Sequence, residues 1–350
     1  MNKYDKRHIA NIKRYQRQIE AIYKKAAEEA ARLSASLPAP DDYIFTFDDF
    51  PELKLQIDAL MASVRDEIKF TVASGIRAEW DLANAKNTAM VQQLLGKAAK
   101  LARYNRTHED ALNAFLNRKE KGLNLSERVW NNTKRFKNEI EMGLDCGIRD
   151  GLDAAAMARQ LKQNLKYPDL LFRRVRDERG VLQLSKRAAE FHPGQGVYRS
   201  SYKNARRLAA TETNIAYRTS DHERWKDLDF VVGIEIHLSN NHTCLNNKGV
   251  PVPFHDICDD LQGEYPKDFK FTGWHPHCRC IAVPILKSKE ERDEDDERIL
   301  RGEEPIDPSE SENAVTELPD NFNQWLEDNE ERIENASSLP YFLRDNKRLL

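Results

Sequence analysis

The stretch that decides the fold is DFVVGIEIHLS at residues 229–239, which a Cys- and His-rich segment separates from CRCIAVPIL at residues 278–286. In the first piece Ile234, Ile236 and Leu238 alternate with other residues, and β-branched side chains are frequent, as is typical of a β-strand. The second piece predicts another strand that closes the same region. The chain before residue 229 predicts mainly helix. We therefore expect a mainly α fold with long N-terminal helices and one small α+β domain.

The helices are predicted from apolar residues at three- and four-residue steps. Residues 3–34 follow this pattern without Pro or Gly, and a second long helix should begin near Pro51, since proline is favoured at a helix start. In GLNLSERVW, which ends at Trp130, Ser126 is the expected cap of a further helix. Asp153 should cap the next one. A last long helix is expected from about residue 200 to 226.

Charge and composition divide the 350 residues into five predicted segments. They are a helical hairpin or bundle at 1–120, a basic helical middle region at 121–228, a small strand-containing Cys/His metal domain at 229–286, an acidic linker at 287–318, and a C-terminal docking helix and tail at 319–350. The linker assignment rests on residues 287–312, where twelve Asp and Glu face five Lys and Arg.

The net charge of -3 conceals a basic segment at residues 160–207, with twelve Lys and Arg against four Asp and Glu. Part of it, around Arg179-Gly180, predicts a two-stranded hairpin. Phosphate contacts need Lys and Arg, so DNA or a partner protein could bind here, and a solvated basic loop is the alternative. The candidate contact residues are Arg173, Arg174, Arg176, Lys186, Arg187, Arg206 and Arg207.

Several classes of protein are excluded or disfavoured by missing patterns. No window approaches about eighteen consecutive apolar residues, so no transmembrane helix is expected. The basic N-terminal stretch lacks the apolar core of a secretory signal, and we expect the protein to stay in a cytoplasm. The sequence contains no P-loop, no G-x-S-x-G and no His-Glu-x-x-His motif.

Potential metal ligands gather in residues 222–280, which hold six of the nine His and four of the five Cys. In a reducing compartment, clustered cysteines favour metal ligation over disulfides. Zinc prefers four tetrahedral N/S ligands, usually supplied as short-spaced pairs, and His275 with Cys278 has the spacing of one pair. Cys280 lies two residues further at the start of a predicted strand, so it can face the same side as Cys278.

The upstream half of this site is ambiguous by spacing. His255 and Cys258 repeat the spacing of the first pair, while His242 and Cys244 are equally well placed across a loop that contains Gly and Pro. Ordinary buried thiols beside loop histidines are the alternative to a metal site. Four protein ligands would make a structural site that substitutes for a small core.

Three protein ligands and a water would instead make a catalytic site. Asp256, Asp259 or Glu264 could then serve as the general base.

Three motifs carry a resemblance to a known family. They are LSERVW at 125–130, the helix ARRLAATETNIAYR at 205–218 with its Thr211-Glu212 pair, and the cluster CDDLQGEYP…GWHPHCRC, in which His275 to Cys280 and Cys258-x4-Gly263 are the most specific parts. On these residues the stretch from about 125 to 286 resembles the phage head-morphogenesis family, the minor head proteins that include the Mu F-like proteins. Glu212 itself is either a helical surface charge or a buried anchor paired with an arginine.

The resemblance implies a minor capsid protein of a tailed phage or prophage, located in the virion or procapsid and in the bacterial host cytoplasm during assembly. Its partners would be portal and capsid or scaffold proteins, and it would assist head assembly, DNA packaging or delivery without catalysis. A structural zinc would be held by Cys258, His275 and Cys278, with Cys244 and Cys280 next. The family often has Cys-x2-Cys upstream, whereas this chain has His255 at the first of those positions.

Two other functions compete with this assignment. The surplus of His and Asp in the cluster fits a zinc-dependent nuclease or toxin-like hydrolase, although no known nuclease signature is present. The aromatic tail from Trp325 to Leu350 could serve as a docking peptide of a regulatory module, or as a clasp within the chain.

Overall fold

The structure is a computed structural model of the chain. It describes residues 1–35, 37, 45–96, 102–176, 178–180, 182–184, 197–239, 243–246 and 250–350, and for 172–176, 182–184 and 244–245 it describes the backbone alone. Within these ranges no helix is long and apolar enough to cross a membrane.

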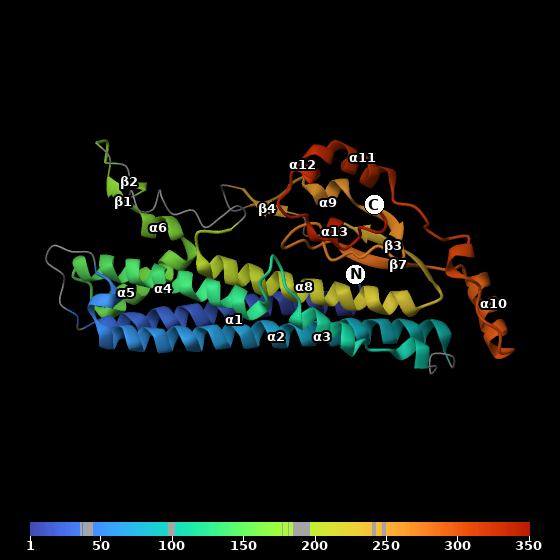
Figure 1. The fold of residues 1–350 in the computed structure, drawn as a ribbon, viewed down its shortest axis with the longest axis horizontal. Coiled ribbons are helices and arrows are strands. Elements are labelled where there is room, and N and C mark those ends of the chain that lie inside the picture. Colours follow the sequence, from blue (N-terminus) through green and yellow to red (C-terminus); the bar gives the residue numbers. More distant parts are fainter. Residues whose placement is uncertain are drawn as a thin grey trace. The chain divides into compact units, whose positions relative to one another are not determined.

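The chain is mainly helical with a small β component, which confirms the predicted fold class. Figure 1 labels the main elements. The helices are α1 Lys3–Ser34, α2 Pro51–Leu95, α3 Glu109–Asn117, α4 Leu125–Arg149, α5 Ala154–Lys166, α6 Pro168–Phe172, α8 Ser201–Asp227, α9 Ile257–Asp260, α10 Lys289–Leu300, α11 Asp320–Asp328, α12 Glu330–Glu334 and α13 Tyr341–Arg344, with short 3-10 turns η1 Phe47–Asp49, η3 Ala102–Asn105 and η4 Pro308–Glu310. The strands are β1 Arg173–Arg176, β2 Leu182–Leu184, β3 Val231–His237, β4 Thr243–Leu245, β5 Pro251–Pro253, β6 Gly263–Pro266 and β7 Ile281–Leu286.

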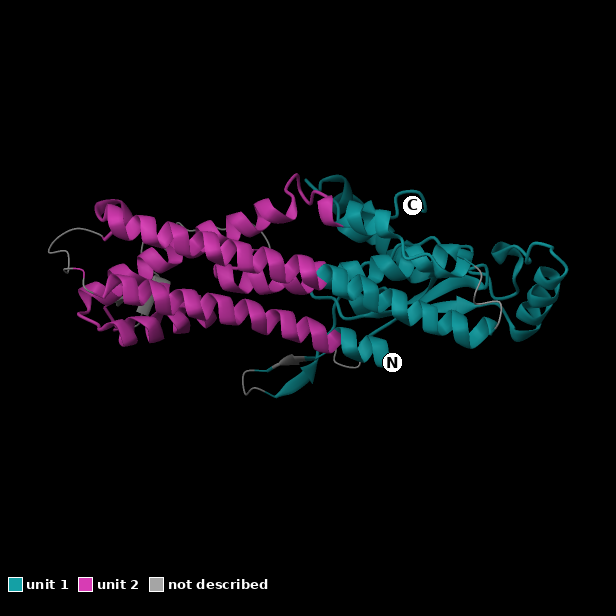
Figure 2. Ribbon diagram, turned by 90° about the horizontal axis from the view of Figure 1, so that it is seen from below, with its two compact units in different colours: residues 1–8, 76–115, 213–350 teal, residues 9–75, 116–212 magenta. Residues whose placement is uncertain are grey.

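The chain forms two compact units, each built from separate stretches of sequence (Figure 2). Unit 1 comprises residues 1–8, 76–115 and 213–350, and unit 2 comprises residues 9–75 and 116–212. Helices α1, α2, α3 and α8 therefore contribute residues to both units.

Unit 2 is a set of packed helices with an aromatic core. The ring of Tyr23 on α1 lies 4.4 Å from that of Phe136 on α4 and 5.7 Å from that of Tyr202 on α8, measured between centroids. Helices α4 and α5 approach closely because α4 carries glycines at the contact. A Cβ on Gly143 would lie 2.3 Å from Leu161 Cδ2, a separation that packed atoms cannot adopt.

The ends of the unit 2 helices follow capping chemistry. Asn124, and not the predicted Ser126, caps α4, because its side chain accepts a hydrogen bond from the Glu127 amide while the Glu127 carboxylate accepts one from the Asn124 amide. This capping box satisfies two amides that a cap at Ser126 would leave open. Asp153 caps α5 through the Ala156 amide, as predicted.

A buried carboxylate links three parts of unit 2. Glu212 on α8 is 2% exposed and pairs with Arg118 Nη2 at 2.6 Å and with Arg128 Nη2 at 2.8 Å. Glu212 is thus the buried anchor of the two alternatives that the sequence left open. Since α8 continues into unit 1, the Thr211-Glu212 motif lies directly before the part of the helix that reaches the candidate site.

Unit 1 contains a three-stranded antiparallel sheet in the order β6-β3-β7. Central strand β3 pairs through Ile234 with Tyr265 of β6 and with Pro284 of β7. The strand prediction is confirmed, and Val231, Val232, Ile234 and Ile236 are all buried in it. The sheet packs on an aromatic core in which the ring centroids of Tyr265 and Phe269 lie 4.5 Å apart.

The C-terminal tail belongs to the same core. Phe322 on α11 and Phe342 on α13 are 0% and 1% exposed, and the Phe342 ring lies 5.3 Å from that of Trp274. Asn346 fixes the end of the tail, because it accepts a hydrogen bond from the Lys270 amide and donates one to the Lys270 carbonyl. The tail thus docks on its own chain.

The acidic segment differs in part from the linker predicted for it. Residues 289–300 form helix α10, which begins with a capping box between Ser288 and Glu291. Lys287, whose side chain is 0% exposed, pairs with Asp295 at 2.7 Å. Two carboxylates of this helix thus have partners within the chain, since Asp295 pairs with Lys287 and Glu291 also accepts hydrogen bonds from Ser311 and the Glu312 amide.

Candidate metal centre

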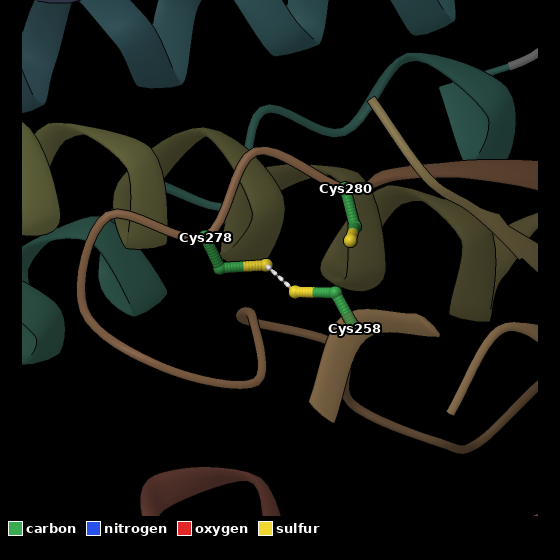
Figure 3. Close-up of side chains that lie close together, drawn as sticks. All are labelled: Cys258, Cys278 and Cys280. Atoms are coloured by element: carbon green, nitrogen blue, oxygen red, sulfur yellow. Dashed lines mark hydrogen bonds between the residues drawn. The ribbon is translucent and has the colours of Figure 1, made fainter. Parts of the chain in front are cut away.

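Three cysteines of unit 1 converge on one buried point. Cys258 lies in α9, and Cys278 and Cys280 lie in the loop that leads into β7. They are 1%, 1% and 3% exposed, and all three are free thiols. Their sulfurs lie within 4.8 Å of one another, and those of Cys258 and Cys278 are 3.8 Å apart (Figure 3). Such a cluster could hold a metal ion.

His275 adds a nitrogen to the cluster. Its Nε2 atom lies 3.1 Å from Cys258 Sγ, and its Nδ1 atom lies 2.8 Å from the Pro276 carbonyl oxygen. Because a carbonyl can only accept, the proton belongs on Nδ1 and the lone pair on Nε2 faces Cys258 Sγ. Metal-binding histidines are commonly oriented in this way by a hydrogen bond at the other ring nitrogen.

The local sequence explains how the ligands are placed. Asp256 caps α9 and accepts a hydrogen bond from the Cys258 amide at 2.8 Å, which fixes the first cysteine. In the HPHC stretch the Cys278 amide donates to the His275 carbonyl at 3.0 Å and His277 has a positive φ of 67°, so the chain turns tightly between two ligands. His275 and Cys278 each lie near Cys258, but they belong to two different groups of potential ligands, so their pairing at one metal stays a prediction.

The thiols influence one another's pKa in the absence of a metal. Hydrogen bonding to Cys278 and Cys280, with burial, raises the pKa of the Cys258 thiol. Burial also acts to raise the pKa of Cys278, but hydrogen bonds from the other two thiols and the nearby Arg218 guanidinium outweigh it and hold that pKa well below its usual range. Cys278 is therefore the first of the three to become a thiolate, which is the form that binds metals.

A second overlapping group consists of Asp256, Cys258 and His275. Asp256 Oδ2 lies 3.3 Å from His275 Nε2. The other carboxylate oxygen of Asp256 is already used by the Cys258 amide in the helix cap. The carboxylate of Asp256 thus lies at the edge of the cluster while it caps α9.

The structure describes the other predicted candidates only in part. Residue 242 lies outside the described residues, and for Cys244 only the backbone, in strand β4, is described. His255 is exposed and lies 3.3 Å from Asp260, apart from the described thiol cluster, so its spacing to Cys258 was misleading. Asp259 serves in the α9 cap.

The candidate contact residues of the basic segment are only partly described. The predicted hairpin is present, because β1 and β2 pair antiparallel, but the side chains of Arg173, Arg174 and Arg176 lie outside the described set, as do Lys186 and Arg187. Arg206 and Arg207 on α8 lie over the rings of Tyr202 and Tyr198. Both are half-buried, and burial lowers the pKa of Arg207.

Sequence reasoning did not find the residues that support the cluster from helix α8. Asn214 donates to the Cys278 carbonyl at 2.7 Å, and Arg218 donates to the carbonyls of Thr272, Cys278 and Cys280. Both residues belong to the ARRLAATETNIAYR motif, but nothing in their spacing links them to a loop about sixty residues away.

Fold and site together define a mainly helical protein with a small three-stranded sheet, near which a buried Cys/His cluster could hold a metal ion. Comparison with protein-family models, with curated proteins and with solved structures found no match to this chain.

Proposed function

We propose that this chain is a minor head protein of a tailed phage or prophage, which associates with the portal or procapsid and assists head assembly or DNA packaging and delivery. The observation that carries the proposal is the convergence of Cys258, Cys278 and Cys280, with His275 lying against Cys258. These residues form the most specific part of the resemblance, and they come from two sequence stretches that only folding brings together.

The metal that suits this cluster best is zinc in a structural role. Three thiolates and one imidazole are a common zinc donor set, and four protein ligands leave no position for a substrate. Two Zn–S bonds at a tetrahedral angle place their sulfurs about 3.8 Å apart, and Cys258 and Cys278 are separated by that distance. When bound, zinc would supply no reaction and would join α9 to the loop before β7.

The long helices fit an assembly role better than a catalytic one. Helices α1 and α2 run for 32 and 45 residues and offer extended surfaces for portal, capsid or scaffold partners. The C-terminal aromatics are used inside unit 1, so the tail is a clasp and the long helices are the better candidates for partner contact. The basic segment remains our candidate for DNA contact.

Particle composition tests the proposed function. The gene would be deleted in the phage or prophage that encodes it, and heads would be purified with and without a tagged copy supplied in trans. We expect the tagged chain in purified heads, and fewer filled or infectious particles when it is missing. Normal particles without the gene, and heads that never contain the chain, would contradict the proposal.

A zinc-dependent nuclease or hydrolase is the alternative, and one contact favours it. Asp256 lies 3.3 Å from His275 Nε2, and the His275 side chain is 35% exposed, so a carboxylate and a partly open ligand lie together. Purified protein would be incubated with DNA, with Asp256→Ala as the comparison. Cleavage that copurifies with the wild type and is lost in Asp256→Ala would favour the enzyme.

A further inference from the structure

Arg218 on α8 is a buried cation beside the thiol cluster. It is 7% exposed. Its Nη1 donates to the Thr272 carbonyl at 2.9 Å, and its Nη2 donates to the carbonyls of Cys278 and Cys280 at 3.0 and 2.6 Å. The planar guanidinium lies over the Phe271 ring, 4.8 Å from the centroid. One side chain thus holds the backbone of the loop at residues 272–280, which we call the ligand loop, at three points.

The loop is shaped to admit this guanidinium. Gly273 has a φ of 115°, which side-chain-bearing residues rarely adopt. A Cβ at this position would lie 2.3 Å from Arg218 Nη1. The glycine therefore removes the atom that would block Arg218, and it does so between Thr272 and the ligand His275.

The charge of Arg218 has no carboxylate partner among the residues that the structure describes. Carbonyl dipoles satisfy its N–H groups, but burying a charge without a counter-ion is costly. The nearest candidate for an anion is Cys278 Sγ, 3.9 Å from Nη2. The counter-ion should therefore be sought in the thiol cluster.

The possible ligand sets differ in charge. A divalent zinc with three thiolates and a neutral imidazole carries one net negative charge. Asp256, Cys258 and His275 around the same ion would give a neutral centre and leave Arg218 uncompensated. Replacing His275 by Asp256 beside three thiolates would give two negative charges. Among these sets, three thiolates with one neutral fourth ligand match a single arginine; His275, beside Cys258, can supply that ligand, and a bound water would give the same charge.

We propose that Arg218 is the counter-ion and positioning residue of this metal centre, and that it selects three thiolates and one neutral fourth ligand, for which His275 is the candidate. This inference rests on the proposed zinc centre. Asn214, one helical turn earlier, shares the positioning role through its 2.7 Å hydrogen bond to the Cys278 carbonyl. The motif helix α8 thus forms one wall of the centre.

The test compares zinc affinity in full-length variants, measured by competition with a chromogenic chelator. Arg218→Gln removes the positive charge and keeps an amide N–H donor. Arg218→Lys keeps the charge but lacks the planar guanidinium with its several N–H donors. We expect Arg218→Gln to weaken zinc binding by about 10- to 100-fold, the range typical of lost outer-shell partners, and Arg218→Lys to weaken it less. Equal affinity in wild type and Arg218→Gln would overturn the inference.

Arg224 supplies a matched control. It is a second buried arginine on α8, 2% exposed, and it donates to the carbonyls of Arg106 and Tyr104. Arg224→Gln should lower thermal stability without changing zinc affinity. An equal loss of zinc affinity in Arg224→Gln and Arg218→Gln would show that any damage to α8 has this effect, and would overturn the specific role.

A charge-compensating variant keeps the inference testable if Arg218→Gln folds poorly. Cys280→His makes a neutral centre, so the same Arg218→Gln change should cost much less zinc affinity in that background. The same loss in both backgrounds would contradict charge balance. Absence of zinc from the wild type would instead contradict the proposed metal centre, which separates the two failures.

Discussion

The side-chain amide of Asn214 donates a 2.7 Å hydrogen bond to the carbonyl of Cys278, which lies 64 residues further along the chain. Asn214 is held in turn by His8, whose Nε2 lies 3.0 Å from its Oδ1, and His8 Nδ1 lies 2.6 Å from Glu79. The ligand loop is therefore connected through buried side chains to α1 and α2 within unit 1. Changes in this chain of hydrogen bonds should loosen the loop.

Asn214→Ala leaves the Cys278 carbonyl with fewer donors and both His8 and the loop less fixed. We expect unfolding to become easier by about 1–3 kcal/mol, the cost of unsatisfied buried polar groups. Urea unfolding measures the free energy, and hydrogen exchange should show faster exchange in residues 272–280. Asn335→Ala, which removes an exposed bond to the Glu331 carbonyl, is the control and should change little. Unchanged exchange in the loop would contradict this role of Asn214.

Glu212→Gln breaks a buried ion pair in unit 2. Two arginines, each partly buried, would lose their shared carboxylate, and we expect a loss of roughly 3–5 kcal/mol in the free energy of unfolding. Glu223→Gln, on the same helix, removes a more exposed pair with Lys226 and should cost less than about 1 kcal/mol. Similar effects of the two substitutions would show that Glu212 is not an anchor.

Glu139 should make stability depend on pH. Burial raises the pKa of its carboxyl group to about 7, although hydrogen bonds from Ser201 act in the opposite direction. Between about pH 4.5 and 7 the folded chain keeps a proton that the unfolded chain has lost, so this contribution falls as pH rises, by up to roughly 3 kcal/mol. Glu139→Gln cannot ionise and should lose this slope. Urea unfolding of the wild type and of Glu139→Gln at several pH values provides the measurement. If the free energy of unfolding depended on pH in the same way in both proteins, Glu139 would not be the group responsible.

Phe342→Ala tests the clasp formed by the C-terminal tail. The side chain is 1% exposed among Trp274, Phe322 and Trp325, and its removal should cost about 3–5 kcal/mol. Limited proteolysis should then cleave the tail faster. Leu350→Ala, at a half-exposed position, serves as the control. A wild-type-like free energy of unfolding in Phe342→Ala would mean that the tail is free to bind a partner.

Much of the fold could be predicted from local pattern, because helices and strands depend on residues close in sequence. The start of α2 at Pro51 and strand β3 follow directly from proline placement and alternation. The cap of α4 was misplaced because Asn124 and Ser126 both suit a helix start, and only the reciprocal bonds with Glu127 decide between them.

The site was predictable in part. His275 and Cys278 are joined by a tight turn and both lie near Cys258, as their closeness in sequence suggested, while their sharing of one metal stays a prediction. His255 repeated that spacing but points to solvent beside Asp260, since spacing does not fix the direction of a side chain. The role of Arg218 could not be predicted, because its contacts with the ligand loop arise only when α8 packs against it.

We propose that Cys258, Cys278 and Cys280, with His275 beside them, hold one zinc ion. Elemental analysis of the full chain, purified without chelators, tests it most directly. We predict about one zinc per chain, lost in Cys258→Ser and in Cys278→Ser together with the fold of the 250–286 region. The control Cys146→Ser, in α4 of unit 2, should retain it. A wild-type chain without zinc, or ligand variants that keep it, would contradict the account.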